Sequence, residues 1–106
     1  MTAGQTKINK ITLNFFYRDN NPDCQITRRA IYDILDNYFD KLIMKEINFD
    51  NNKAICDSYK VYGIPTLLIL KNNKVLNRYS GILDSDEIRL FLEPVINNVL
   101  HKMKEK

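Results

Sequence analysis

The chain has 106 residues and a net charge of +3; 44% of its residues are hydrophobic and 27% are charged. This balance is typical of a globular protein, and we expect residues 1–106 to form one domain with a core of its own. The densest basic cluster, Lys102, Lys104 and Lys106, has no interleaved aromatic residues, which argues against a nucleic-acid-binding surface, and no apolar run approaches the roughly 18 residues of a transmembrane helix.

The first half of the chain is predicted to form a strand, a helix and a second strand, after a short polar arm at residues 1–10. The segment from Ile11 to Tyr17 is rich in β-forming residues and predicts the first strand. The segment from Leu42 to Phe49 predicts the second strand. Between them, the apolar residues keep helical spacing: Ile26, Ala30, Ile31, Ile34, Leu35 and Tyr38.

The start of this helix is marked by three residues of different kinds. Asn21 is a favourable N-cap, and Pro22 suits the first helical position. Asp23 places a negative charge in the first turn, where the helix dipole favours it. Cys24 therefore falls within the first turn of the predicted helix.

A short helix at residues 51–59 and a hairpin are predicted next. The hairpin strands, at residues 66–70 and 75–79, flank a turn that contains Asn72 and Asn73. Asparagine tolerates positive φ better than most residues, so this pair suits a tight hairpin turn.

The last predicted element is a long helix capped by Ser85. It carries an apolar stripe into a C-terminal extension at residues 98–106. Because proline removes a backbone hydrogen bond inside a helix, we expect Pro94 to bend or interrupt this helix near Leu90.

The predicted element order is thus β-α-β-α-β-β-α, which places the chain in the α/β class. A helix between the first two strands implies a right-handed crossover and parallel pairing, and the late hairpin implies antiparallel pairing. We expect a central mixed sheet with helices on both faces.

Several motifs resemble those of the thioredoxin family, in the same order and at the same spacing. The run from Gly63 to Thr66 resembles the strand start that carries the cis-proline of thioredoxins, and an X-Pro bond adopts the cis form more readily than any other. The run from Asn48 to Asp50 matches the family's Asn-x-Asp. The run from Asn21 to Cys24 lies where thioredoxins carry Cys-x-x-Cys. The resemblance covers roughly Ile11 to Ile96 and implies the thioredoxin fold.

The chain departs from this family at both ends. It has no room for most of the strand and helix that precede the first core strand of thioredoxins, so the strand near Ile43 is expected at an edge of the sheet. The C-terminal helix runs past the usual family end. Its Val99, Leu100 and Met103 are expected to be buried against the chain itself rather than in a dimer.

The resemblance implies a disulfide site with only one of its two thiols. Asn21 stands where a thioredoxin has its attacking cysteine, and Cys24 stands at the resolving position, so the ordinary dithiol cycle is not available. In another register, Cys24 attacks as part of a Cys-x-x-Thr motif ending at Thr27, which leaves Pro22 and Asp23 outside the helix. A helix N-terminus favours the Cys24 thiolate, but Asp23 opposes it. Alternatively, Cys24 is simply a small buried hydrophobic residue.

Two further positions near this site differ from the family pattern. Thioredoxins commonly bury an aspartate in the first core strand beneath the cysteines, with a lysine on the neighbouring strand. Phe15 stands at the aspartate position here, and Glu46 stands at the lysine position. If Glu46 faces inward, burial raises its pKa and the side chain can exchange a proton with Cys24. If Glu46 faces water, it is only a charge on an edge strand.

The peptide-binding half of the site is better preserved. In the family, the residue before the cis-proline offers its backbone to an extended substrate, and here that residue is Ile64. Gly63, Pro65 and Thr66 complete the predicted groove, opposite the loop from Asn21 to Cys24. Such a groove binds by strand addition, which needs no thiol.

The predicted function is therefore that of a monothiol thiol–disulfide oxidoreductase acting through Cys24, with an outside thiol resolving the mixed disulfide. Its partner is expected to be a thiol- or disulfide-containing protein or a small thiol. The alternative is a catalytically inactive thioredoxin-fold module that binds a polypeptide in the groove. No cofactor, metal, nucleic acid or membrane partner is predicted, and we expect a monomer or a weak dimer. Residues 1–7 lack the apolar core of a signal peptide, so a cytoplasmic location is expected.

Overall fold

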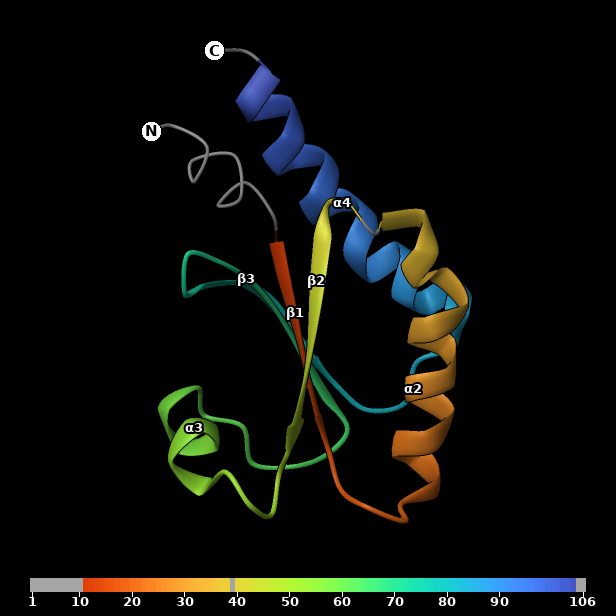
Figure 1. Ribbon diagram of the computed structural model, residues 1–106, viewed down its shortest axis with the longest axis vertical. Coiled ribbons are helices and arrows are strands. Elements are labelled where there is room, and N and C mark those ends of the chain that lie inside the picture. The colour runs from red at the N-terminus through yellow and green to blue at the C-terminus, as the bar shows by residue number, and fades with distance from the viewer. Residues whose placement is uncertain (1–10, 39, 105–106) are drawn as a thin grey trace.

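A computed structural model of the chain describes residues 11–38 and 40–104, with side chains as far as residue 99. The predicted N-terminal arm at residues 1–10 and the side chains of Leu100 and Met103 lie outside this description. The elements follow the predicted order (Figure 1): β1 (Ile11–Tyr17), α2 (Pro22–Leu35), a 3-10 turn η1 (Asp36–Tyr38), β2 (Leu42–Asn48), α3 (Lys53–Ser58), β3 (Thr66–Lys71), β4 (Lys74–Ser80) and α4 (Ser85–Lys104).

The strands form a four-stranded mixed sheet in the order β2-β1-β3-β4. β1 pairs in parallel with β2, and β3 pairs antiparallel with both β1 and β4. The predicted pairing is therefore confirmed, and β2 lies at an edge of the sheet that residues 11–38 and 40–104 form, as expected. Phe16 of β1 lies opposite Thr66 of β3, so the end of β1 and the start of β3 meet at one end of the sheet.

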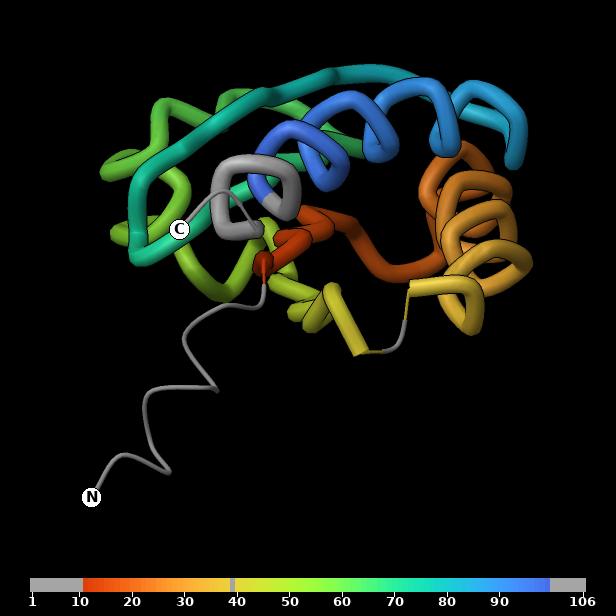
Figure 2. Tube along the Cα trace, turned by 90° about the horizontal axis from the view of Figure 1, so that it is seen from above, coloured from red at the N-terminus to blue at the C-terminus, as the bar shows by residue number. Residues whose placement is uncertain are grey.

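Helices cover both faces of the sheet, as predicted. α2 and α4 lie on one face and the short α3 on the other (Figure 1). Seen from above, α2 runs beside the first turns of α4 (Figure 2), and these two helices are in contact. None of the helices in the described part of the chain combines the length and the apolar character needed to cross a membrane.

The core divides into two clusters because alternate residues of a strand point to opposite faces. Phe15 of β1 packs in the larger cluster, with Ile31 of α2 and Leu92 of α4. Its neighbour Phe16 points the other way and packs in the smaller cluster, with Cys56 of α3. The hydrophobic residues of β3 alternate between the two clusters in the same manner.

The turn of the hairpin is as predicted, because Asn72 and Asn73 have φ values of 53° and 68°. The start of α4 differs from the prediction. Asp84 rather than Ser85 caps this helix: its Oδ1 accepts a hydrogen bond from the Glu87 amide at 2.8 Å, and Glu87 Oε1 accepts one from the Asp84 amide at 2.9 Å. Both Asp84 and Ser85 are good N-cap residues, and the reciprocal bond to Glu87 favours Asp84.

Pro94 lies inside α4, which continues through it to Lys104. The interruption predicted near Leu90 is therefore wrong. Proline costs the helix one backbone bond, but buried residues on both sides of Pro94, Leu92 and Ile96, hold the helix against the sheet. Tertiary packing outweighs the local preference here.

Two leucines of α4 test this account of the helix. Leu92 is 1% exposed and Leu90 is 72% exposed. We expect Leu92→Ala to lower the free energy of unfolding by about 2–5 kcal/mol, because it opens a cavity in the larger cluster. Leu90→Ala is the matched control and should change it by less than about 0.5 kcal/mol. Urea denaturation measures both, and equal losses would contradict the assignment of the buried face.

Candidate functional site

The predicted site residues gather at one end of the sheet, where β1 ends and β3 begins. The loop after β1 leads into α2, and Pro65 directly precedes β3. The Ile64–Pro65 peptide bond is cis, and the Pro65 carbonyl accepts a hydrogen bond from the Gly81 amide at 2.9 Å. Ile64 packs against the core cluster that contains Cys24. The thiol and the proline loop therefore share one region of the molecule.

Asn21 determines where α2 begins. Its backbone is extended, with φ −103° and ψ 120°, and its Oδ1 accepts a hydrogen bond from the Cys24 amide at 2.9 Å. Pro22 is at the first helical position, and Asp23 lies in the first turn. The helix thus includes Pro22 and Asp23, which the register with an attacking Cys24 would leave outside.

Cys24 is fully buried, with an exposed fraction of 0%. Its Sγ accepts a hydrogen bond from the backbone amide of Arg18 at 3.5 Å. Burial raises the pKa of the Cys24 thiol; the Arg18 amide and the positive charge of Arg28 act against this rise, and the negative charge of Asp23 adds to it. Burial is the largest of these effects, so the neutral thiol is favoured at neutral pH.

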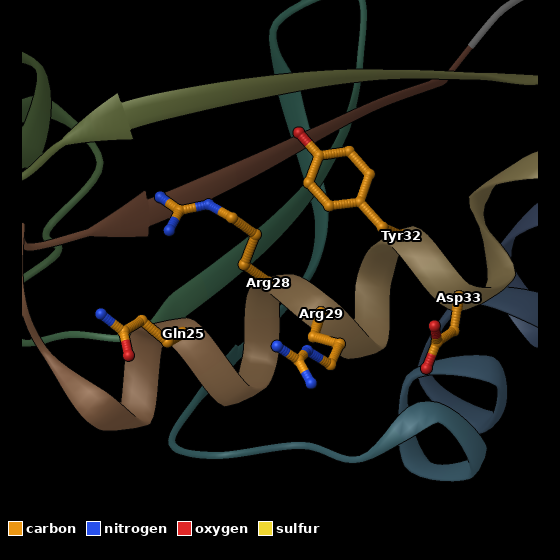
Figure 3. Close-up of a pocket in the computed structure, with 5 residues that line it drawn as sticks. All are labelled: Gln25, Arg28, Arg29, Tyr32 and Asp33. Carbon is orange, nitrogen blue, oxygen red and sulfur yellow. The ribbon is translucent and has the colours of Figure 1, made fainter.

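A basic side chain covers the position where thioredoxins bury an aspartate. Phe15 has no exposed surface at this position. The Arg28 guanidinium lies 5.3 Å from the Phe15 ring centroid and 4.6 Å from that of Tyr17. These are cation–π distances, so Arg28 is stabilised by both rings. Arg28 points from α2 toward the strands (Figure 3).

Glu46 of β2 is bound by two side chains of α2. Arg28 Nε lies 2.8 Å from Glu46 Oε1, and the Tyr32 hydroxyl donates to Glu46 Oε2. Figure 3 shows the Tyr32 ring extending toward the strands beside Arg28, whereas Asp33 points toward the start of α4, where its Oδ2 accepts a hydrogen bond from the Ser85 hydroxyl at 3.1 Å. Partial burial raises the pKa of Glu46, but the hydrogen bonds from Tyr32 and Arg28 outweigh burial and lower it overall. Glu46 is therefore a carboxylate at neutral pH, and the hydrogen bonds described for it go to α2 rather than to Cys24.

The predicted groove residues lie in and before the start of β3. Gly63 is exposed, and a side chain there would meet nothing within 4 Å. The Thr66 hydroxyl donates to the Gly63 carbonyl at 2.8 Å, which holds the loop around Pro65. Two apolar side chains beside this loop face solvent: Tyr62 is 77% exposed and Ile82 is 45% exposed. This exposed apolar rim is suited to an extended polypeptide.

The two cysteines are free and do not approach each other. Cys24 belongs to the larger core cluster, and Cys56 belongs to the smaller one on the other face of the sheet. Cys56 is 3% exposed, which fits a packing role. Among the described residues, no group of three or more His, Cys, Asp or Glu side chains is arranged to hold a metal ion.

Sequence reasoning missed two arginines that act on Cys24. Arg28 had a detectable signal, because it follows Cys24 by four positions on a helix and so lies on the same side. Arg18 had no such signal in the sequence. Its backbone amide donates to the Cys24 sulfur only because the loop after β1 turns back over the start of α2.

The family model for thioredoxin matches residues 5–94 of the chain. The chain belongs to the thioredoxin family. It is 33% identical to thioredoxin of Buchnera aphidicola subsp. Baizongia pistaciae over 82 residues, which are 77% of this chain and 74% of that protein. It is 27% identical to mitochondrial thioredoxin of Bos taurus over 73 residues, which are 69% of this chain but only 44% of that protein.

Solved structures agree with this family at the level of the fold. A mutant thioredoxin from Halobacterium salinarum NRC-1 superimposes with a TM-score of 0.73 at 24% identity, over 81% of this chain and 74% of that one. Thioredoxin-2 of a malaria parasite gives a TM-score of 0.74 at 17% identity, over 81% and 84% of the two chains. The family match and the thioredoxin relatives support a thioredoxin-like redox protein.

The pair of Glu46 and Arg28 predicts a dependence of stability on pH. A carboxyl whose pKa is lowered on folding stabilises the protein above its unfolded pKa, and this contribution is lost as pH falls through the folded pKa. Because Glu46 is about one-third exposed, the contribution is below about 1 kcal/mol. We expect Glu46→Gln to flatten the fall in unfolding free energy between about pH 5 and about pH 3, measured by urea denaturation.

Tyr32→Phe is the matched variant for this prediction, because it removes only the hydroxyl that donates to Glu46. It should flatten the same part of the profile to a smaller extent. A profile for Glu46→Gln that is parallel to wild type would show that the pair does not contribute.

Proposed function

We propose that this thioredoxin-family chain works in thiol–disulfide exchange as a monothiol protein, with Cys24 as its only reacting sulfur. The observation that carries the proposal is the position of Cys24 in the first turn of α2, at the same end of the sheet as Pro65. Asn21 takes the place of the second thiol and uses its side chain to cap the helix.

The exchange needs a thiol from outside the chain. The Cys24 thiolate attacks one sulfur of a partner disulfide, a new S–S bond forms, and the other partner sulfur leaves as a thiolate that takes up a proton from water. Because Asn21 has no sulfur, a second thiol from solution or from the partner then attacks the partner's sulfur in the mixed disulfide. Cys24 leaves as the thiolate, and the outside thiol remains bonded to the partner.

The partner would be held by the loop before β3. The backbone of Ile64 and the open space at Gly63 suit an extended polypeptide, with Tyr62 and Ile82 as apolar contacts. Pro22 and Asp23, at the start of α2, would form the side of the proposed groove opposite the loop before β3. Two free cysteines fit a reducing compartment such as the cytoplasm, with the protein as a monomer or weak dimer.

The burial of the Cys24 sulfur slows this exchange. A buried thiol with a raised pKa supplies little thiolate at neutral pH and presents no surface to a disulfide. The reaction therefore proceeds from a locally opened state, which a bound partner would favour.

The complete burial of Cys24 also favours a second candidate function. In this alternative the chain is a catalytically inactive thioredoxin-fold module that binds a polypeptide at the loop before β3, without any thiol step. Both candidates use the same groove, and they differ only in whether Cys24 reacts.

Alkylation of the two cysteines distinguishes the candidates. We expect iodoacetamide to label Cys24 faster than Cys56, because Cys24 needs only a local opening, with a pH midpoint above the ordinary value of about 8.5 because burial raises its pKa. Peptide mass spectrometry at a series of pH values measures both rates. A Cys24 that is labelled no faster than Cys56 at any pH would leave only the binding module.

The missing thiol can be restored. We expect Asn21→Cys to raise the rate of insulin reduction by dithiothreitol severalfold above wild type, because the second thiol would then be supplied within the chain. Asn21→Ser is the control: it preserves a capping side chain and adds no sulfur, so it should show no gain. If Asn21→Cys remains folded by circular dichroism and shows no gain, then the proposed position of the thiol pair is wrong.

A further inference from the structure

The loop between β1 and α2 is tied at two points to the turn that follows β2. Arg18 Nε and Nη2 bind both carboxylate oxygens of Asp50, at distances of 2.9–3.2 Å. Asn48 Nδ2 donates to Asp19 Oδ2 at 3.2 Å. We call these four residues, Arg18, Asp19, Asn48 and Asp50, the loop clamp. It joins segments that are about thirty residues apart in the chain.

The turn after β2 is stabilised by hydrogen bonds of its own, in addition to those of the loop clamp. Asn48 Oδ1 accepts hydrogen bonds from the backbone amides of Asp50 at 2.9 Å and Asn51 at 3.2 Å. The Arg18 guanidinium also lies 5.5 Å from the ring centroid of Phe49. The bidentate contact of Arg18 with Asp50 fixes the orientation of the guanidinium relative to this turn. A lysine, which makes a single point contact, would not fix an orientation in this way.

The clamp is connected directly to the thiol. The backbone amide that donates to Cys24 Sγ belongs to Arg18, the residue whose side chain is bound by Asp50. Holding the Arg18 side chain therefore holds the amide donor over the sulfur. With the loop in this position, Cys24 has an exposed fraction of 0%.

We propose that Arg18 and Asp50 are positioning residues for the reaction of Cys24: their contact holds the β1–α2 loop closed over the sulfur, and separating them opens the thiol to disulfides. The inference rests on the proposed function, since it assigns the gate of the same site. Each of the two side chains is about half exposed, at 47% and 49%. Exposed ion pairs are weak and are screened by salt, so this gate opens at low cost.

Arg18 and Asp50 of the loop clamp have opposite effects on charge at the sulfur. The charged groups that act on Cys24 are Arg18 in the loop and Arg28 and Asp23 on α2. Asp50→Asn leaves the Arg18 cation without its counter-charge, which favours the Cys24 thiolate. Arg18→Gln removes that cation, which disfavours the thiolate. These opposite shifts of the midpoint report the charges at the sulfur, whereas a rise in the limiting labelling rate of both variants reports opening of the loop.

The experiment is iodoacetamide labelling of Cys24 over a pH series in wild type, Asp50→Asn and Arg18→Gln. The limiting rate above the pH midpoint reports opening of the loop, and we expect both variants to raise it, by up to about fivefold. The midpoint itself should move down for Asp50→Asn and up for Arg18→Gln. Glutathione labelled in the same tube is the reference thiol for the variants, because the charge of Asp50 also acts on Cys56.

Asp86→Asn is the matched control. It removes one carboxylate from the exposed pair of Arg89 and Asp86 on α4, which are 2.9 Å apart, and it should change neither the limiting rate nor the midpoint. A second measurement uses the wild-type protein alone. Raising NaCl from about 0.02 M to about 0.5 M should increase the limiting rate of iodoacetamide labelling of Cys24, because salt screens the ion pair of Arg18 and Asp50.

Two outcomes would overturn the inference, and they have different meanings for the proposed function. If Cys24 is labelled faster than Cys56 but neither variant nor salt changes its limiting rate, the clamp is not the gate and the monothiol function stands. If Cys24 stays as slow as Cys56 in wild type and both variants, neither the gate nor the monothiol function holds.

Discussion

The hydrogen bond from the Cys24 amide to the Asn21 side chain is the interaction on which the site depends, because it determines where α2 begins. A start at this point places Cys24 in the first turn with its sulfur in the core. It also places Thr27 where its hydroxyl accepts from the Leu83 amide, and Arg28 where it reaches across the strands. Sliding the sequence by one residue along α2 would rotate all three side chains by about 100°.

The charges around the thiol are arranged differently from what the family resemblance implies. Phe15 has no group that could accept a proton from Cys24. The carboxylate on the neighbouring strand, Glu46, is ion-paired with Arg28 and accepts a hydrogen bond from the Tyr32 hydroxyl. Cys24 is packed in the larger apolar cluster, and the charges that act on its sulfur are those of Arg28, Asp23 and Arg18. Burial keeps the proton on the thiol, and the two arginines limit how far its pKa rises. This balance is typical of a thiol that reacts only when its surroundings open.

A buried thiol and the proposed polypeptide site before β3 are compatible if the loop between β1 and α2 moves. Its side-chain contacts to the turn after β2 are exposed polar bonds, whereas the strand and helix on either side are held by the core. The segment that covers the sulfur is thus held to the turn after β2 by exposed polar contacts. A partner bound at Ile64 would lie beside that segment and would gain access to Cys24 without disturbing the core.

The sequence by itself determined the features that depend on near neighbours along the chain. The strand at β1, the helix start at Asn21 with Pro22, and the turn at Asn72 and Asn73 were all predicted, because caps, proline and positive φ act within a few residues. Where two local signals competed, as at Asp84 and Ser85, sequence reasoning chose wrongly, and at Pro94 it did not anticipate that packing would carry the helix onward.

Only the tertiary structure decided how the site behaves. The burial of Cys24, the binding of Glu46 by α2, and the contact between Arg18 and Asp50 all join segments that are distant in the chain. The physical reason is that burial and ion pairing depend on which elements the sheet brings together, and short-range patterns in a sequence carry little information about that.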